Sequence, residues 1–119
     1  MQKTIKIGNT EYSMKSSAWT QFAYKNETGR SLISDIQTIV DMQKQLENKE
    51  LKELDAFEKI NDILLKIAYV MIKEADENQL DDYISFLKNI DVFNYSDQNL
   101  VNDIINLACN PLLGQLQNN

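Results

Sequence analysis

The sequence predicts a mainly α-helical α+β domain, in which a short N-terminal β-hairpin carries about five helices packed as a small bundle. Apolar and polar residues alternate in residues 3–14, whereas apolar residues after them recur at spacings of three and four. The chain of 119 residues has three glycines and one proline, so little interrupts its helices. We therefore expect one domain over residues 1–110, with a modest core, and a flexible tail over residues 111–119.

The hairpin is predicted from the segment TIKIGNTEYSM. Ile5 and Ile7 fall on one face of the first strand, and Tyr12 continues this apolar face in the second strand. Gly8-Asn9 suits a two-residue turn, because glycine adopts a positive φ without a steric penalty, and this turn pairs Ile5 with Tyr12. Two strands alone are barely stable in water, so we expect their apolar face to lie on helices.

A first helix is predicted from the segment SSAWTQFAYKNET. Ser16 or Ser17 can cap its N-terminus by accepting a backbone N–H. Trp19 and Phe22 recur at helical spacing with an alanine, and we expect this stripe to face the core. Tyr24 falls off the stripe, and because exposed aromatic residues often mark binding sites, we treat it as a candidate partner-binding residue.

The segment NETGRSL contains what resembles a phosphate-binding loop, but its spacing favours a corner between two helices. A phosphate loop needs a glycine five residues before Gly29, where this chain has Tyr24, and a lysine where it has Arg30. Gly29 suits the left-handed conformation at a helix C-terminus, and Ser31 suits the cap of a second helix. The apolar positions of this second helix are Leu32, Ile36, Ile39, Val40 and Leu46.

Three further helices follow the charged segment ENKELKE. The longest runs from Leu54 to about Ala75 and is apolar over most of its circumference, which is typical of a central helix. A shorter helix ends near Asn89, and a last helix runs from a Ser96 cap to Pro111. For the shorter helix we expect the inward residues to be Leu80, Tyr83, Ile84 and Leu87.

Side chains that could carry catalysis or hold a metal are few. The chain has no histidine, and Cys109, its one cysteine, lies on an apolar helix face where a buried packing role is expected. The segment DENQLDD resembles a calcium loop only in its acidity, because the required glycine and terminal glutamate are missing. Its carboxylates suit a solvated turn. We therefore expect no catalytic residue, no cofactor and no metal site, and rank an enzyme as the least favoured class.

Charge and hydropathy restrict the partners. With 18 acidic and 12 basic residues, the net charge of −6 opposes binding to a nucleic-acid backbone. The longest apolar run, Ile63–Ile72, is interrupted by Lys66 and is about half the length of a membrane span. The single cysteine and the absence of an apolar signal segment lead us to expect a protein of the reducing cytoplasm.

Some apolar residues exceed what one small core needs. Leu51, Leu65, Ile72 and Val101 are therefore candidates for binding an apolar helix of a partner. The alternative is that all four pack inside the domain or in a homo-oligomer.

The order of elements resembles one known family. The hairpin IKIGNTEYSMK is followed by AWTQFAYKNETGRSLISDIQ, an aromatic helix, a glycine and a Ser-Leu restart, within an acidic chain. This order is similar to that of the tail assembly chaperones of long-tailed bacteriophages and prophages of Gram-positive bacteria. The resemblance covers about the first forty residues, while the remainder agrees only in being helical and acidic.

The resemblance implies a protein without enzymatic activity. Such chaperones bind the tape measure protein and keep it soluble in the host bacterial cytoplasm while the tail tube assembles around it, and they are absent from the mature virion. The family often makes a longer form by ribosomal frameshifting, so a frameshift-extended form of this chain is an expected partner. Self-association is expected as well.

The alternative from another class is a small acidic regulator or inhibitor that binds a basic site on another protein. It would need its carboxylates gathered on one face. Here acidic residues are spread over nearly every segment of the chain, which favours the chaperone hypothesis.

Overall fold

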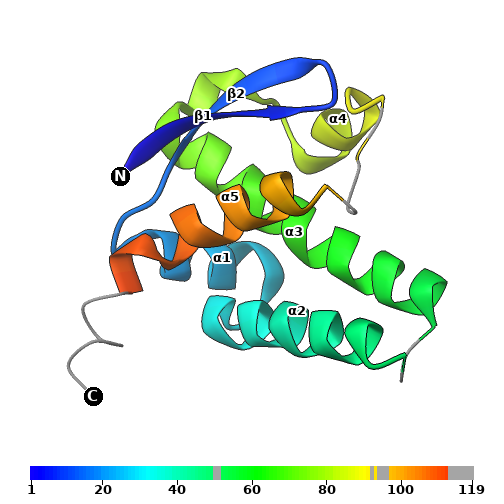
Figure 1. The fold of residues 1–119 in the computed structure, drawn as a ribbon. Helices are drawn as coiled ribbons and strands as arrows, with labels where there is room; N and C mark the ends of the chain where they lie inside the picture. Colours follow the sequence, from blue (N-terminus) through cyan, green and yellow to red (C-terminus); the bar gives the residue numbers. More distant parts are fainter. Residues whose placement is uncertain (50–51, 92, 94–96, 113–119) are drawn as a thin grey trace.

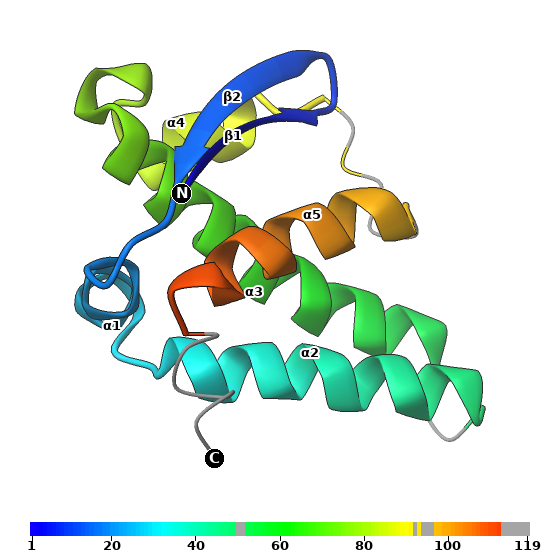
Figure 2. The same cartoon turned by 60° about the vertical axis from the view of Figure 1, so that its left-hand side comes forward.

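The computed structural model describes residues 1–49, 52–91, 93 and 97–112, and it has the predicted fold class (Figure 1). An antiparallel hairpin lies on one side of a long central helix, and two helices lie on the other side (Figures 1 and 2). The strands and helices are β1 (Gln2–Ile7), β2 (Thr10–Lys15), α1 (Thr20–Thr28), α2 (Leu32–Glu47), α3 (Glu53–Ala75), α4 (Tyr83–Lys88) and α5 (Gln98–Cys109). Two 3-10 turns, η1 (Glu77–Gln79) and η2 (Asn110–Leu112), follow α3 and α5.

The hairpin has the predicted turn and register. Gly8 has a φ of 62°, and Ile5 pairs with Tyr12 across the two strands. The inward side chains of both strands, Ile5, Ile7, Tyr12 and Met14, are buried. They pack on α3 and α5, and the Tyr12 ring meets the Phe86 ring of α4 edge-on at 5.6 Å. The helices therefore cover the apolar face that two strands alone would leave in water.

The outer edge of β2 is closed by the side chain of Gln79. Its amide oxygen accepts the Ser13 N–H at 3.2 Å, and its amide nitrogen donates to the Ser13 carbonyl at 3.0 Å. The same nitrogen lies 3.2 Å from the Ile72 carbonyl at the end of α3. The glutamine amide thus replaces one peptide unit of a third strand and ties the hairpin to the end of the central helix.

Helix α3 is the centre of the molecule, as its apolar circumference predicted. Its C-terminal half is covered on several sides by the hairpin, α1 and α5, and its N-terminal half lies along α2 (Figure 2). Its buried apolar residues are Ala56, Ile60, Ile63, Leu64, Ile67, Ala68, Tyr69, Val70, Met71 and Ile72. Leu54, the predicted first residue of this helix, is 80% exposed, because it lies in the first turn of α3, at the end away from the hairpin.

The corner between α1 and α2 is confirmed. Gly29 ends α1 with a φ of 75°, and its N–H donates to the Lys25 carbonyl at 2.7 Å. Ser31 caps α2 by accepting the Ser34 N–H at 3.2 Å. The residues that resembled a phosphate loop thus form a helix stop and restart.

The first helix begins later than predicted. The Ser17 hydroxyl accepts the Trp19 N–H at 3.1 Å in a turn before the helix, and Trp19 occupies the capping position without a side-chain bond. Ser16 is buried, and its backbone pairs with that of Met1. The serines therefore shape the turn that leads from β2 into α1, and the prediction that one of them caps the helix is wrong.

The inward face of α4 also differs from the prediction. Phe86 is fully buried against the rings of Tyr12, Tyr69 and Tyr83, whereas Ile84 and Leu87 are exposed. Because α4 has only six residues, the aromatic contacts of Phe86 decide which side of it faces the core.

The last helix begins at an aspartate. Asp97 caps α5 by accepting the N–H groups of Asn99 and Leu100, at 3.0 and 3.3 Å; Ser96, the predicted cap, lies outside the described residues. Pro111 lies in η2, and Leu112 is buried, so the packed part of the chain extends past the predicted boundary at residue 110. Most of the predicted tail, residues 113–119, lies outside the described residues. Among the described residues, no helix is both long and apolar enough to cross a membrane.

We predict that Gln79→Ala lowers the free energy of unfolding by about 1–3 kcal/mol, because the Ser13 amide and carbonyl lose their partner at the strand edge. The matched control is Gln37→Ala, since the Gln37 amide donates to the exposed Asp41 carboxylate within α2, at 2.9 Å. For that control we expect a loss of at most about 0.5 kcal/mol. Urea denaturation of the two variants measures the difference, and equal stabilities would contradict the structural role of Gln79.

Candidate interaction surface

Two aromatic side chains lie exposed at the start of α1. Trp19 and Phe22 are each 56% exposed, and their rings stack on one another with centroids 6.2 Å apart and planes 28° apart. We call them the aromatic pair. Aromatic side chains are enriched at protein interfaces, so the pair is a candidate contact for a partner.

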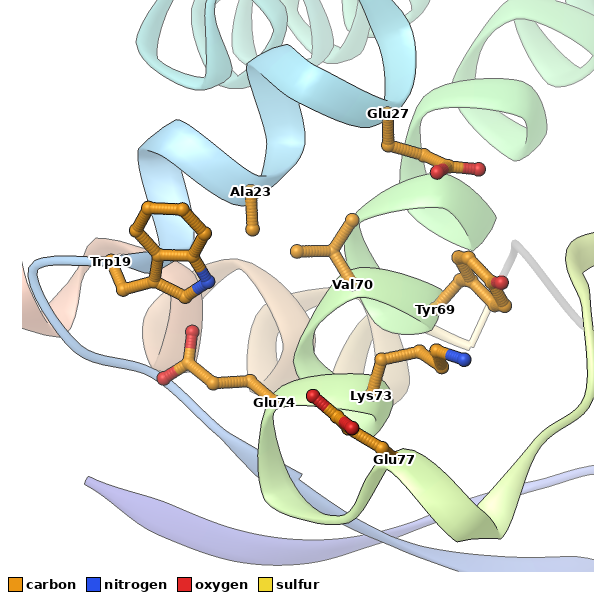
Figure 3. A pocket seen from close by; sticks show the side chains of 8 residues that line it. All are labelled: Trp19, Ala23, Glu27, Tyr69, Val70, Lys73, Glu74 and Glu77. Atoms are coloured by element: carbon orange, nitrogen blue, oxygen red, sulfur yellow. The ribbon is translucent and has the colours of Figure 1, made fainter.

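A hollow of about 300 Å³ adjoins the aromatic pair, between the start of α1 and the C-terminal half of α3 (Figure 3). Its lining residues are Trp19, Ala23, Glu27, Tyr69, Val70, Lys73, Glu74 and Glu77. The rings of Trp19 and Tyr69 and the side chain of Val70 give it apolar walls. Three of its eight lining side chains are glutamates. We call it the acidic hollow.

The carboxylates of the acidic hollow differ in their partners. Glu27 lies 3.6 Å from the Lys66 ammonium, so its charge is already paired. The Thr20 hydroxyl donates a hydrogen bond to Oε1 of Glu74 at 2.7 Å. The second carboxylate oxygen of Glu74, Oε2, is buried without a hydrogen-bond partner. Lys73 turns toward the Tyr69 ring, 6.0 Å from its centroid, and Glu74 points toward Trp19 (Figure 3). The end of the hollow at Trp19 is therefore electronegative.

A polar cluster holds α1 in the orientation that exposes the aromatic pair. The Tyr24 hydroxyl donates a short hydrogen bond to the Asp35 carboxylate, which also accepts from Arg30 Nε at 2.8 Å. Arg30 reaches Asp62 of α3 at 3.8 Å. Burial, followed by the hydrogen bond to Asp35, raises the pKa of Tyr24, and the hydrogen bond to Asp35 raises the pKa of Arg30. The cluster thus joins α1, α2 and α3.

The predicted roles of the α1 aromatic residues are therefore reversed. Tyr24, the candidate for partner binding, is fully buried, and Trp19 and Phe22, which were assigned to the core, are on the surface. The physical reason lies in the inward face of α1, which carries Thr20 and Tyr24 four residues apart. Their hydroxyls donate hydrogen bonds to carboxylates of α3 and α2, which the phenyl ring of Phe22 cannot do.

The other candidate residues lie elsewhere. Ile72 and Val101 are buried in the core, so for these two the alternative of packing inside the domain is correct. Leu65 is partly buried and packs against the same core. Leu51 lies outside the described residues. The structure thus does not bring the candidate residues that it describes together into one surface.

The aromatic pair had only a weak signal in the sequence. Trp19 and Phe22 are three residues apart, and Thr20 and Tyr24 are four apart, so both pairs fit one face of a helix. Hydrophobicity favours the first pair for the core. Only the positions of Asp35 and Glu74 on neighbouring helices favour the second, and these are not visible in the local pattern.

Several carboxylates that could be read as a metal or catalytic cluster serve as helix caps. Asp76 accepts the Asn78 N–H at 2.9 Å, and Asp82 accepts the Ser85 N–H at 2.7 Å, which lowers the pKa of Asp82. In the part of the chain that the structure describes, no three His, Cys, Asp or Glu side chains are grouped to hold a metal. Burial raises the pKa of the partly buried Cys109 thiol and so disfavours its reactive thiolate.

In comparisons with known proteins, no protein-family model, no curated protein and no solved structure matches this chain.

We predict that Tyr24→Phe reduces the loss of stability at alkaline pH. Because its folded-state pKa lies above the ordinary value of 10, Tyr24 ionises first in the unfolded chain, and stability falls as the pH rises above 10. One such group contributes a slope of at most about 1.4 kcal/mol per pH unit. Burial also raises the pKa of Tyr83, to about 12, so part of the slope remains in the variant.

Urea denaturation at several values between about pH 8 and about pH 11 measures this slope. Below pH 10 we expect the free energies of unfolding of wild type and Tyr24→Phe to differ by a constant amount, because Tyr24 is neutral there in both the folded and the unfolded state. An identical alkaline slope in wild type and variant would contradict the burial of the Tyr24 hydroxyl.

Proposed function

We propose that this protein is a tail assembly chaperone of a long-tailed bacteriophage or prophage. It binds apolar helical segments of the tape measure protein in the bacterial cytoplasm, keeps that protein soluble while the tail tube assembles, and leaves before the virion is complete. It acts by binding alone and converts no substrate.

The observation that carries the proposal is the exposed, stacked pair of Trp19 and Phe22. It lies in the segment that resembles the chaperone family, directly after the hairpin and before the Gly29–Ser31 corner. The other apolar side chains of α1 and α3 near it are buried or partly buried, so the pair stands apart from an otherwise covered core. A partner helix that laid its apolar face on both rings would remove them from water.

The size of the aromatic pair suits weak, reversible binding. Each of the two residues is more than half exposed, which leaves on the order of 200 Å² to cover, worth on the order of 5 kcal/mol at about 25 cal/mol per Å². The loss of translational and rotational freedom on association offsets most of this gain. One copy would therefore bind one segment weakly, whereas many copies, aided by self-association, would coat a long helix and still be displaced by the growing tube.

The test is co-expression with a helical fragment of the tape measure protein from the same genome. We expect the wild-type chain to keep the fragment soluble and to co-purify with it, and the double variant Trp19→Ala/Phe22→Ala to lose both effects. Ile84→Ala is the matched control, because Ile84 is 63% exposed on α4, away from the aromatic pair. An insoluble fragment in the presence of the wild-type chain would overturn the proposed function.

Salt dependence separates this function from that of an acidic regulator. Binding through the aromatic pair is mainly apolar and should persist at moderate ionic strength, whereas binding of a basic protein to an acidic surface is screened. Loss of all binding at moderate salt would favour the regulator.

A further inference from the structure

The acidic hollow has a chemistry that an apolar partner helix would not use. Trp19 belongs both to the aromatic pair and to the wall of the hollow, so a segment lying on the pair also covers the hollow. If that segment were entirely apolar, it would seal the carboxylates of Glu74 and Glu77 away from water. The Oε2 of Glu74 is already buried and has no hydrogen-bond partner.

We propose that the acidic hollow binds a cationic side chain, an arginine in particular, carried by the segment that the aromatic pair covers. The guanidinium group lies against the Trp19 ring, donates hydrogen bonds to the exposed Glu77 carboxylate and is attracted by the neighbouring charge of Glu74. This inference rests on the proposed function, because it specifies the chemistry of the partner segment. That segment is an amphipathic helix with a basic residue beside its apolar stripe.

The charges within the hollow support a cation. Glu27 is paired with Lys66, and Lys73 extends toward the Tyr69 ring at the end away from Trp19. Glu74 and Glu77 are therefore opposed by a single lysine that is turned away. An anionic group would meet both carboxylates at close range, which excludes a phosphate or a carboxylate as the occupant.

Arginine fits this surface better than lysine does. Its planar guanidinium stacks on an aromatic ring and presents five N–H donors, which suits the Trp19 ring beside two carboxylates. The 300 Å³ of the hollow accommodates such a group with its aliphatic stem against Val70 and Ala23.

The spacing of the two contacts defines the partner sequence. The Trp19 and Phe22 rings are 6.2 Å apart, close to the 5.4 Å pitch of an α-helix. A bound helix can therefore place a leucine or methionine on Phe22 and an arginine over Trp19 when the two residues are three or four positions apart.

Trp19 is the one tryptophan of the chain, so its fluorescence reports directly on the hollow. The probes are two synthetic amphipathic helical peptides that differ only at one position, arginine in the first and the neutral isostere citrulline in the second. We expect the arginine peptide to change the emission of the full chain and to bind about five- to tenfold more tightly at low salt.

The variant Glu74→Gln/Glu77→Gln should abolish this preference. The glutamine that replaces Glu74 can still accept the Thr20 hydroxyl through Oε1, so the contact between α1 and α3 is kept. The control is Glu58→Gln with Asp55→Asn, which removes two charges from the exposed N-terminal part of α3, well away from the hollow. We expect the control to keep the preference for arginine, and circular dichroism to show the same fold in all three proteins.

Three results with the peptides would overturn the inference. They are equal affinity for the two peptides, an arginine preference that survives in the glutamine variant, and an unchanged Trp19 emission on binding. A Trp19 emission that depends on protein concentration without peptide would also overturn it, because a second copy of the chain would then occupy the hollow.

The test of the cation site can fail independently of the test of the chaperone function. If the tape measure fragment co-purifies equally well with wild type and with the glutamine variant, the cation site is wrong and the chaperone function stands. If the arginine peptide binds as expected while the wild-type chain fails to solubilise the fragment, the cation site stands and the proposed partner is wrong.

Discussion

The apolar circumference of α3 has to be covered on nearly all sides, and this requirement places the other elements that the structure describes. The hairpin and α5 cover the C-terminal half of α3 from one direction and α1 covers it from another, while α2 lies along its N-terminal half (Figure 2). The loss of water contact by these side chains is the largest favourable contribution to folding. Polar links at the ends of α3, such as the Gln79 amide on β2, then set the exact positions.

In helix α1, polar contacts outweigh hydrophobicity in deciding which face of the helix packs against the core. Its inward residues end in hydroxyl groups, and each hydroxyl meets a carboxylate on a neighbouring helix, Asp35 on α2 or Glu74 on α3. A buried carboxylate without a donor would be costly, so the pairs are retained together. The consequence is that Trp19 and Phe22 remain outside, so contacts that stabilise the fold also leave exposed the surface that we propose for binding.

The same surface combines two kinds of attraction at neighbouring points. In the proposed complex the aromatic pair would contribute an apolar contact that salt hardly changes, and the acidic hollow would contribute an electrostatic contact that salt weakens. Together they would select an amphipathic helix with a basic residue over an entirely apolar helix. A chaperone needs such selectivity if it is to bind its client and not the apolar segments of other proteins.

The sequence by itself determined the hairpin and its register, the Gly29–Ser31 corner and the long central helix, because each of these depends on local periodicity and on a few residues with narrow backbone preferences. Only the tertiary structure decided which faces of the short helices α1 and α4 point inward. In α1 the apolar pattern favours the face that is exposed, and α4 is too short for its pattern to decide. The choice of face depends on partners on other elements, such as Asp35, Glu74 and Tyr12. For that reason the fold class was predictable, and the aromatic pair with its acidic hollow was not.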